Sequence, residues 1–100
     1  MITKLSEKGY LEVIPVSFNF VSELDAEIIV TATVTVTTFT GVDLNPAVLL
    51  KDAPLVVDGV VYQWVKSGKI GVAYLFVCKV TTSGGRTLTL SAILPVVISV

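Results

Sequence analysis

The feature that most constrains the fold is segment 74–96, which reads as two alternating strands around a Ser83-Gly84-Gly85 turn. With these three residues as the loop, the facing pairs are Thr82 with Arg86, Val80 with Leu88, Cys78 with Leu90, Phe76 with Ala92, and Tyr74 with Leu94. A two-residue loop would place apolar opposite polar residues, because a slip of one residue turns the whole set to the other face. The longer loop needs Gly85 in a left-handed conformation, which glycine tolerates. We therefore predict an all-β fold organised by this hairpin.

Three further segments read as strands. Residues 10–20 form the first, and Pro15 within it marks an edge position or a bulge, because proline cannot donate to a ladder. A polar turn at 22–27 leads to residues 28–37, which alternate strictly. The inward set is Val30, Ala32, Val34 and Val36, and the outward set is Thr31, Thr33, Thr35 and Thr37. Residues 60–66 carry apolar side chains on both faces, so this strand is central or covered by another subunit.

Two turn signals complete the predicted fold. Asn45-Pro46 is an N-cap followed by proline, which predicts one helical turn near residues 46–50, with residues 48–50 covering an open end of the sheets. Asp58-Gly59 predicts a tight turn between two strands. About six or seven strands at this spacing predict an immunoglobulin-like, two-sheet antiparallel sandwich, with a barrel as the alternative. We expect residues 1–100 to form a single domain.

Composition indicates extensive protein interfaces. Of the 100 residues, 53% are hydrophobic and only 15% are charged, against about 45–50% and 25% in ordinary soluble domains. A small domain cannot bury this surplus in its own core. No apolar run is long enough for a membrane span, and residues 1–9 lack the apolar core of a signal peptide. The seven basic residues are scattered among eight acidic ones, so we expect no nucleic-acid partner.

Catalytic and cofactor chemistry is not expected. The chain has no histidine, which removes serine triads, cysteine–histidine pairs and most zinc sites. The single cysteine, Cys78, faces inward on a strand and reads as a buried, inert thiol. Glu23, Asp25 and Glu27 supply too few oxygens for calcium and read as a solvated turn. We predict a non-enzymatic protein without cofactor or metal.

Three other features have alternative interpretations. The threonine ladder of residues 31–37 invites a water- or carbohydrate-binding surface, but it occupies one strand only, and threonine suits a solvent-facing strand. Tyr62 and Trp64 could form an aromatic ligand platform, although core or interface packing is favoured. Tyr74 follows Gly71 by three residues and is placed to make the corner hydrogen bond common in immunoglobulin-like sandwiches.

The second half of the chain carries a recognisable series of motifs. In order they are Thr40-Gly41-Val42-Asp43-Leu44-Asn45-Pro46, Ala53-Pro54, Val60-Val61-Tyr62-Gln63, Gly71-Val72-Ala73-Tyr74, Thr82-Ser83-Gly84-Gly85-Arg86 and Leu94-Pro95-Val96. Over roughly residues 28–98 the chain resembles small immunoglobulin-like proteins from the structural gene clusters of tailed bacteriophages and prophages. The resemblance implies a virion structural or accessory protein without enzymatic activity.

These arguments converge on a bacteriophage virion structural protein in the neck or collar or on the capsid, made in the host cytoplasm. Its expected partners are other virion proteins and further copies of itself, with no nucleic acid and no membrane. A chain end that is apolar to its last residue should pair with its own sheet or with a neighbour's edge. The candidate interface residues are Tyr62, Trp64, Val96, Val97, Ile98 and Val100. The alternative is a ligand- or carbohydrate-binding sandwich module.

Overall fold

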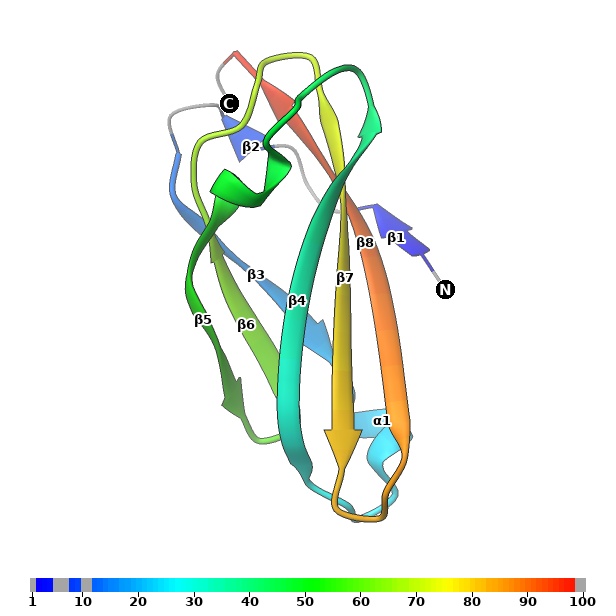
Figure 1. Cartoon of the computed structure of the whole chain (residues 1–100). Coiled ribbons are helices and arrows are strands. Elements are labelled where there is room, and N and C mark those ends of the chain that lie inside the picture. The colour runs from blue at the N-terminus through cyan, green and yellow to red at the C-terminus, as the bar shows by residue number, and fades with distance from the viewer. Residues whose placement is uncertain (1, 5–7, 10–11, 99–100) are drawn as a thin grey trace.

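The computed structural model describes residues 2–4, 8–9 and 12–98 and shows two β-sheets packed face to face (Figure 1). The strands are β1 (Ile2–Lys4), β2 (Lys8–Gly9), β3 (Ile14–Asn19), β4 (Ile29–Thr40), β5 (Leu50–Val57), β6 (Val60–Val65), β7 (Ala73–Thr82) and β8 (Thr87–Val97). Two short helical elements are α1 (Val21–Leu24) and the 3₁₀ turn η1 (Pro46–Leu49). The predicted all-β, two-sheet sandwich is confirmed. The immunoglobulin-like assignment stays a prediction.

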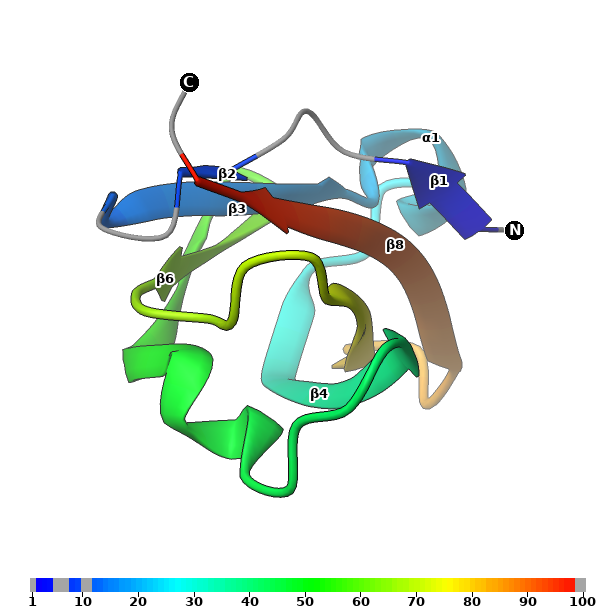
Figure 2. The same cartoon turned by 90° about the horizontal axis from the view of Figure 1, so that it is seen from above.

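One sheet has the strand order β1-β8-β7-β4, with β2 also pairing with β8, and the other has the order β3-β6-β5. The view from above shows the two layers crossing over a shared interior (Figure 2). The pairing is antiparallel except at the N-terminus, where β1 and β2 both run parallel to β8. The sequence did not predict this parallel pairing, since each of the two strands is too short to show an alternating pattern.

The β7–β8 hairpin has the predicted register. Tyr74 lies opposite Leu94, and the ladder continues through the other predicted pairs to Val80 opposite Leu88. The Thr82 N–H donates to the Arg86 carbonyl at 2.9 Å and closes the loop. Gly85 has φ +84°, the left-handed value that the three-residue loop requires.

Strand β3 is shorter than the predicted first strand. It begins at Ile14, and the predicted start at Tyr10 lies outside the described residues. Pro15 sits on β3 at the edge of the three-stranded sheet, as predicted, where the missing backbone N–H of proline is tolerated. The expected polar turn contains the short helix α1, after which Asp25 and Ala26 adopt positive φ values of 48° and 69°.

Strand β4 departs from its predicted alternation at one residue. A register shift between Ile29 and Thr31 makes Val30 the extra residue of a bulge, and its side chain is 61% exposed. The prediction that Val30 faces the core was therefore wrong. Ile29 packs against the core instead, because an extra residue reverses the alternation on one side of a bulge. From Thr31 to Thr37 the threonines face outward as predicted.

The helical turn near residues 46–50 is confirmed as η1. Leu49 is fully buried and Leu50 packs against the core, but Val48 is 52% exposed, so the expected cover comes from two of the three residues. Asn45 makes no side-chain cap. Its backbone N–H instead donates to Asp43 Oδ1 at 3.0 Å. The Asp58-Gly59 turn is confirmed, with φ of 49° and 82°, as a type I′ hairpin turn needs.

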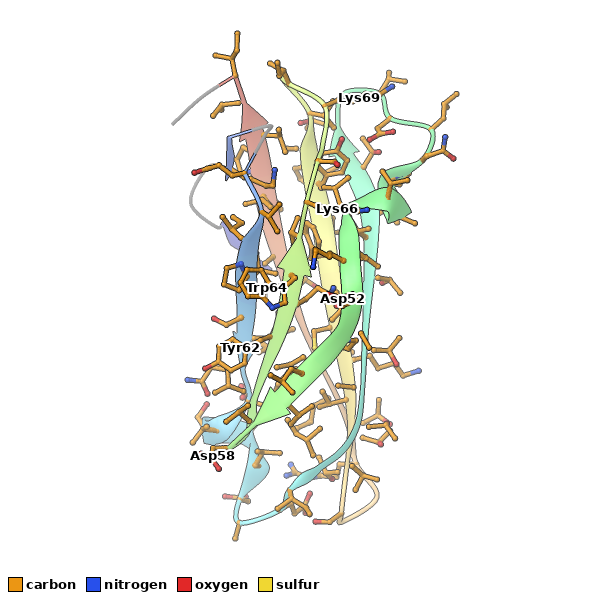
Figure 3. All side chains as sticks on the ribbon, turned by 90° about the vertical axis from the view of Figure 1, so that its left-hand side faces the viewer. Asp52, Asp58, Tyr62, Trp64, Lys66 and Lys69 are labelled. Atoms are coloured by element: carbon orange, nitrogen blue, oxygen red, sulfur yellow. The ribbon has the colours of Figure 1, made fainter. Side chains whose placement is uncertain are left out.

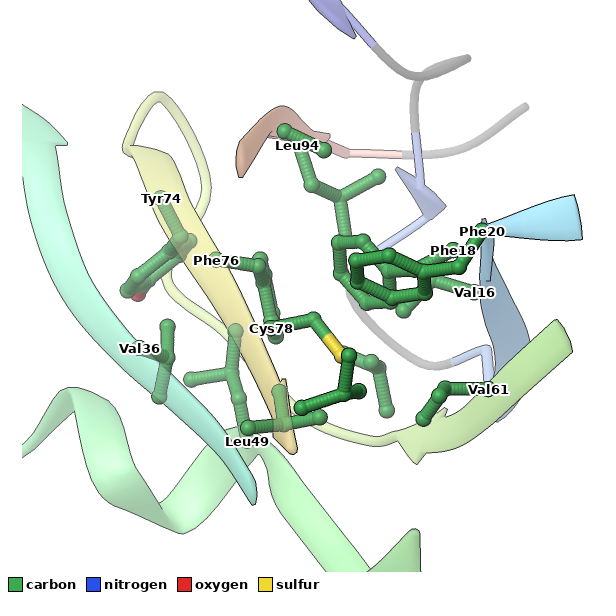
Figure 4. Close-up of a cluster of buried hydrophobic side chains, with 14 of the residues drawn as sticks. Val16, Phe18, Phe20, Val36, Leu49, Val61, Tyr74, Phe76, Cys78 and Leu94 are labelled. Atoms are coloured by element: carbon green, nitrogen blue, oxygen red, sulfur yellow. The ribbon is translucent and has the colours of Figure 1, made fainter. Parts of the chain in front are cut away.

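Both sheets contribute to one hydrophobic core (Figure 4). Tyr74, Phe76 and Cys78 of β7 are fully buried and meet Phe18 and Val61 of the opposite sheet. Burial raises the pKa of the Cys78 thiol to about 12, so the thiol stays protonated and unreactive, as predicted.

Candidate interaction surfaces

The outer side of the three-stranded sheet carries the exposed aromatic residues. Trp64 of β6 lies between Pro15 of β3 and Lys51 of β5, and Tyr62 lies between Ser17 and Leu55. We call this surface the aromatic face and define it as Pro15, Ser17, Lys51, Leu55, Val57, Tyr62 and Trp64. Trp64 is 44% exposed, Tyr62 36% and Leu55 60%. Figure 3 shows the two rings side by side on the ribbon, pointing away from the core.

The other side of β6 explains why this strand looked apolar on both faces. Val61 and Val65 are fully buried, and Gln63 between them is 1% exposed. Gln63 Nε2 donates to the carbonyls of Lys51 and Asp52 at 3.1 Å each. These carbonyls lie where β5 loses register with β6, so the amide replaces missing ladder bonds. The strand is central in its sheet, and its outward aromatic side is uncovered in the isolated chain. A single glutamine in an apolar strand was the available signal for this buried role.

The C-terminal candidate residues occupy three different environments. Val96 is 1% exposed and belongs to the core, whereas Val97 is half-buried and Ile98 is 67% exposed. Val100 lies outside the described residues. Of the two pairings expected for this segment, its own sheet takes Val96 and Val97, which lie opposite Lys8 and Gly9 of β2. Among the described C-terminal candidates, Val97 and Ile98 alone leave side-chain surface for a partner.

Val96 is held by the loop that precedes β7. The Gly71 N–H donates to the Val96 carbonyl at 2.9 Å, and the Val96 N–H donates to the Val72 carbonyl at 3.0 Å. Gly68 in the same loop has φ +104°, and a Cβ there would lie 2.9 Å from Val96 Cγ2. The loop therefore needs glycine at this position to lie close against β8.

Lys8 is a buried cation that the sequence did not reveal. Its side chain is fully buried, and Nζ donates to the carbonyls of Gly9 at 2.8 Å and Ser67 at 2.7 Å. Burial lowers its pKa, and the nearby Glu12 carboxylate opposes this change. These bonds tie β2 to the loop that covers Val96, so the role of Lys8 is structural.

The outer side of the five-stranded sheet is rich in hydroxyl groups. Sequence alone placed threonines on one strand, but the ladders add Thr81 of β7 and Thr89 of β8 to the same face. We define the threonine face as Thr31, Thr33, Thr35, Val77, Lys79, Thr81 and Thr89, which line a shallow hollow of about 500 Å³. Thr31 and Thr81 share a hydrogen bond across the strands. The premise that only one strand carries the threonines was therefore wrong.

Tyr74 makes the predicted corner hydrogen bond. Its hydroxyl accepts from the Lys69 N–H at 2.9 Å and donates to Asp43 Oδ2 at 2.6 Å. Burial, together with this bond to Asp43, raises the pKa of Tyr74 to about 12. The same hydrogen bond is the main reason that the pKa of Asp43 is lowered. The motif joins the loop before η1 to the loop before β7 and serves the fold.

The acidic turn is also structural. Arg86 Nε lies 3.1 Å from Glu27 Oε1, and its guanidinium donates to the carbonyl of Glu23 at 2.7 Å at the end of α1. A hydrogen bond from Thr82 is the largest cause of the lowered pKa of Glu27, followed by Arg86. Within the described residues, no three acidic or cysteine side chains gather as metal ligands.

These features define a β-sandwich protein whose exposed residues form surfaces suited to contacts with other molecules. No helix in the part of the chain that the structure describes has the length and apolarity to cross a bilayer. A family model described as podophage GP4 fiber-tail adaptor protein gp77 matches residues 8–95, and the chain belongs to this family. No curated protein matches the chain. The family is one of phage structural adaptors and is not an enzyme class, so the chain is a phage virion structural protein, as the resemblance implied.

Proposed function

We propose that this chain is a non-catalytic adaptor that joins a fiber to the phage tail and binds its virion partner through the aromatic face. The family description supports an adaptor between fiber and tail. The observation that carries the proposal is that Tyr62 and Trp64 point outward together from the centre of a sheet. Residues 1–100 act as one domain in this proposal, since both sheets share one core.

The chemistry of the aromatic face suits a protein partner. Tryptophan and tyrosine dominate the binding energy of protein interfaces when they enter a desolvated pocket. Leu55 and Val57, at 60% and 45% exposure, extend the apolar surface around them. The ion pair of Lys51 and Asp52, at 3.0 Å, lies beside this apolar centre and supplies a charged rim. Burying such a surface contributes about 25 cal/mol per Å² of apolar area.

Two further contacts complete the proposal. Val97 and Ile98 lie at the end of β8 and offer a smaller apolar surface. Self-association is the second way in which the apolar surplus of the sequence is covered.

A position at the tail is proposed in preference to the neck, collar or capsid, because the family description names fiber and tail.

Complementation tests the aromatic face. Particles of a phage that lacks this gene would be assembled with wild-type chain, Trp64→Ser or Tyr62→Ser supplied in trans. Both variants should fold, yet their copy number in purified particles should fall at least about tenfold, because an aromatic hot spot at the centre of an interface is worth about 2 kcal/mol or more. Thr33→Ala on the threonine face is the matched control and should assemble normally. Normal incorporation of both aromatic variants would refute the role of this face.

Electron microscopy of the same particles tests the position. A tag on the wild-type chain should appear where the fibers meet the tail. Labelling at the neck, collar or capsid surface would instead support the placement expected from the sequence and contradict the tail proposal.

A ligand- or carbohydrate-binding module remains the second candidate, because Tyr62 and Trp64 are exposed together, as such a platform needs. The discriminating measurement is Trp64 fluorescence during titration with host surface polysaccharide. A saturable spectral shift that Tyr62→Ser abolishes would favour the module. An unchanged spectrum, together with loss of particle incorporation in Trp64→Ser, would favour the adaptor.

A further inference from the structure

The edges of the two sheets are protected unequally. Edge strand β3 carries Pro15, and edge strand β5 carries Pro54 together with a register shift near Asp52, whose φ is +65°. The edge of β8 is covered at Ser91–Ile93 by β1 and at its end by β2. Proline, bulges and covering strands are the devices that keep sheet edges from pairing with other chains.

Strand β4 has little of this protection. It is the last strand of its sheet in the described residues, and β7 pairs with only one of its sides (Figure 1). Its twelve residues, Ile29–Thr40, contain no charge, no proline and no glycine. Its register shifts lie only near its ends, between Ile29 and Thr31 and between Thr38 and Thr40. The middle of β4 therefore presents a regular, uncharged edge with no strand paired on its outer side among the described residues, although η1 and β5 pack near β4.

We propose that this edge pairs antiparallel with β4 of a second copy of the chain, around a two-fold axis at Val34. A two-fold contact must be self-complementary, since the same surface is used twice. In this register Thr33 lies opposite Thr35 of the other copy. Ala32 lies opposite Val36, and the two Val34 residues face each other. Every threonine from Thr31 to Thr37 meets a threonine, and every aliphatic residue meets an aliphatic one.

Neighbouring registers fit less well. A shift of one residue places threonine opposite valine or alanine at each step and turns one copy's core side outward. A shift of two residues in one direction places Ala32 opposite Thr38 and Thr31 opposite Phe39, which is 51% exposed beside the terminal register shift. A shift of two in the other direction brings the bulged Val30, which is 61% exposed, opposite Val36. The register centred on Val34 is thus the one that the sequence of β4 supports.

Charge also permits this pairing. Like charges directly opposite each other weaken a strand pair, and β4 brings none. The pairing extends the threonine face across two copies and leaves the aromatic face of each copy free for another partner. The inference rests on the self-association part of the proposed function and is independent of the position at the tail.

Charge-swapped variants test the pairing. Thr33→Lys with Thr35→Lys places lysines opposite each other, and Thr33→Glu with Thr35→Glu does the same with carboxylates. By light scattering after size exclusion, each double variant alone should dissociate at concentrations at least about tenfold higher than the wild type, because like-charge contacts across an interface are costly. An equimolar mixture should regain the dimer. Thr87→Lys with Thr89→Lys on β8 controls for added charge and should dimerise like the wild type.

Two outcomes would overturn the proposal in distinguishable ways. A wild-type dimer that neither double variant weakens would refute pairing through β4 but leave self-association standing. A wild type that stays monomeric at high concentration would refute both. Neither result bears on the binding of the aromatic face to a virion partner, which the complementation experiment measures separately.

Cysteine cross-linking tests the register. A mixture of Thr33→Cys and Thr35→Cys chains should form a disulfide-linked heterodimer under mild oxidation, since these positions lie opposite each other in the Val34 register. Each variant alone should form far less. Efficient cross-linking of Thr35→Cys with itself would mean a register shifted by two residues and would contradict the axis at Val34. Cys78 is fully buried and should not interfere.

Discussion

The aromatic face and the threonine face are the two outer sides of the same sandwich, yet their chemistry is opposite. Trp64 and Tyr62 stand on the central strand of a three-stranded sheet, flanked by Leu55. The other sheet presents threonines from three strands around Lys79. In both sheets, outward residues alternate along each strand with buried inward residues. The alternation is therefore the same for the two faces and does not distinguish them. The difference shows that the inner side determines the fold and leaves each outer side free for a separate role.

Threonine on an outer face needs no partner, because it combines high β propensity with a hydroxyl that water can solvate. Exposed tryptophan and leucine on neighbouring strands form a surface that favours burial against another protein. The comparison therefore predicts that substitutions in the shared core change stability, whereas substitutions on the aromatic face change assembly.

The largest expected effect lies in the core behind both faces. Phe76→Ala should lower the free energy of unfolding by about 3–5 kcal/mol, since Phe76 is fully buried and the change opens a cavity. Lys79→Ala, on the outward side of the same strand, should change it by about 0.5 kcal/mol or less. Urea denaturation measures both. Equal losses would mean that the inner and outer sides of β7 are not separated as described.

The next effect tests how the end of the five-stranded sheet is closed. Gly68→Ala should cost about 2–4 kcal/mol, because it adds a Cβ 2.9 Å from Val96 Cγ2 to the strain of a φ of +104°. Gly71→Ala is the matched control, with φ +83° and no atom near its Cβ, and should cost only about 1–2 kcal/mol. Thermal unfolding compares the two. Similar losses would show that contact with Val96 is unimportant.

A smaller effect concerns the Tyr74 corner. Tyr74→Phe removes the hydrogen bonds to Asp43 and Lys69 and should lower the free energy of unfolding by about 1–3 kcal/mol near pH 7. Phe76→Tyr is the control, because it adds a hydroxyl in the core away from the Tyr74 corner. Combined with Tyr74→Phe, it should not restore the lost free energy of unfolding.

The pH dependence of stability gives a second measure of this corner. The pKa of Asp43 is lowered chiefly by the Tyr74 hydroxyl. A carboxyl with a lowered folded-state pKa stabilises the fold above its unfolded pKa of about 4 and loses that contribution as the pH falls through the folded value. Urea denaturation between about pH 5 and pH 2 should therefore show a shallower decline for Tyr74→Phe than for the wild type. An unchanged slope would show that Tyr74 does not hold the carboxylate.

The smallest effects on stability are expected on the outer faces themselves. Trp64→Ser and Thr33→Ala should each change the free energy of unfolding by about 1 kcal/mol or less, because both side chains are substantially exposed. Their effects on assembly should differ, as the complementation experiment measures. A loss of several kcal/mol for Trp64→Ser would mean that the tryptophan is a core residue and would remove the contrast between the faces.

By itself, the sequence determined the β-hairpin of β7 and β8, its register, the left-handed Gly85, the turn at Asp58-Gly59 and the inert Cys78. Each of these follows from residues close in sequence, where alternation and turn chemistry admit one solution. Inward and outward sides were predicted along most strands for the same reason. The bulge at Val30 was not, because a bulge depends on how β7 pairs with β4 and leaves no local pattern.

Only the tertiary structure decided which outward residues share a face. Sheet order places the threonines of β4, β7 and β8 together and sets Trp64 between Pro15 and Lys51. It also buries Lys8, whose residue type gave no sign of that position, Gln63, for which the apolar strand around it was the one signal, and Val96, which had been expected at an interface. The physical reason is that lateral neighbours in a sheet come from strands far apart in the chain. Periodicity along one strand says which side a residue faces, and only strand pairing says what lies beside it.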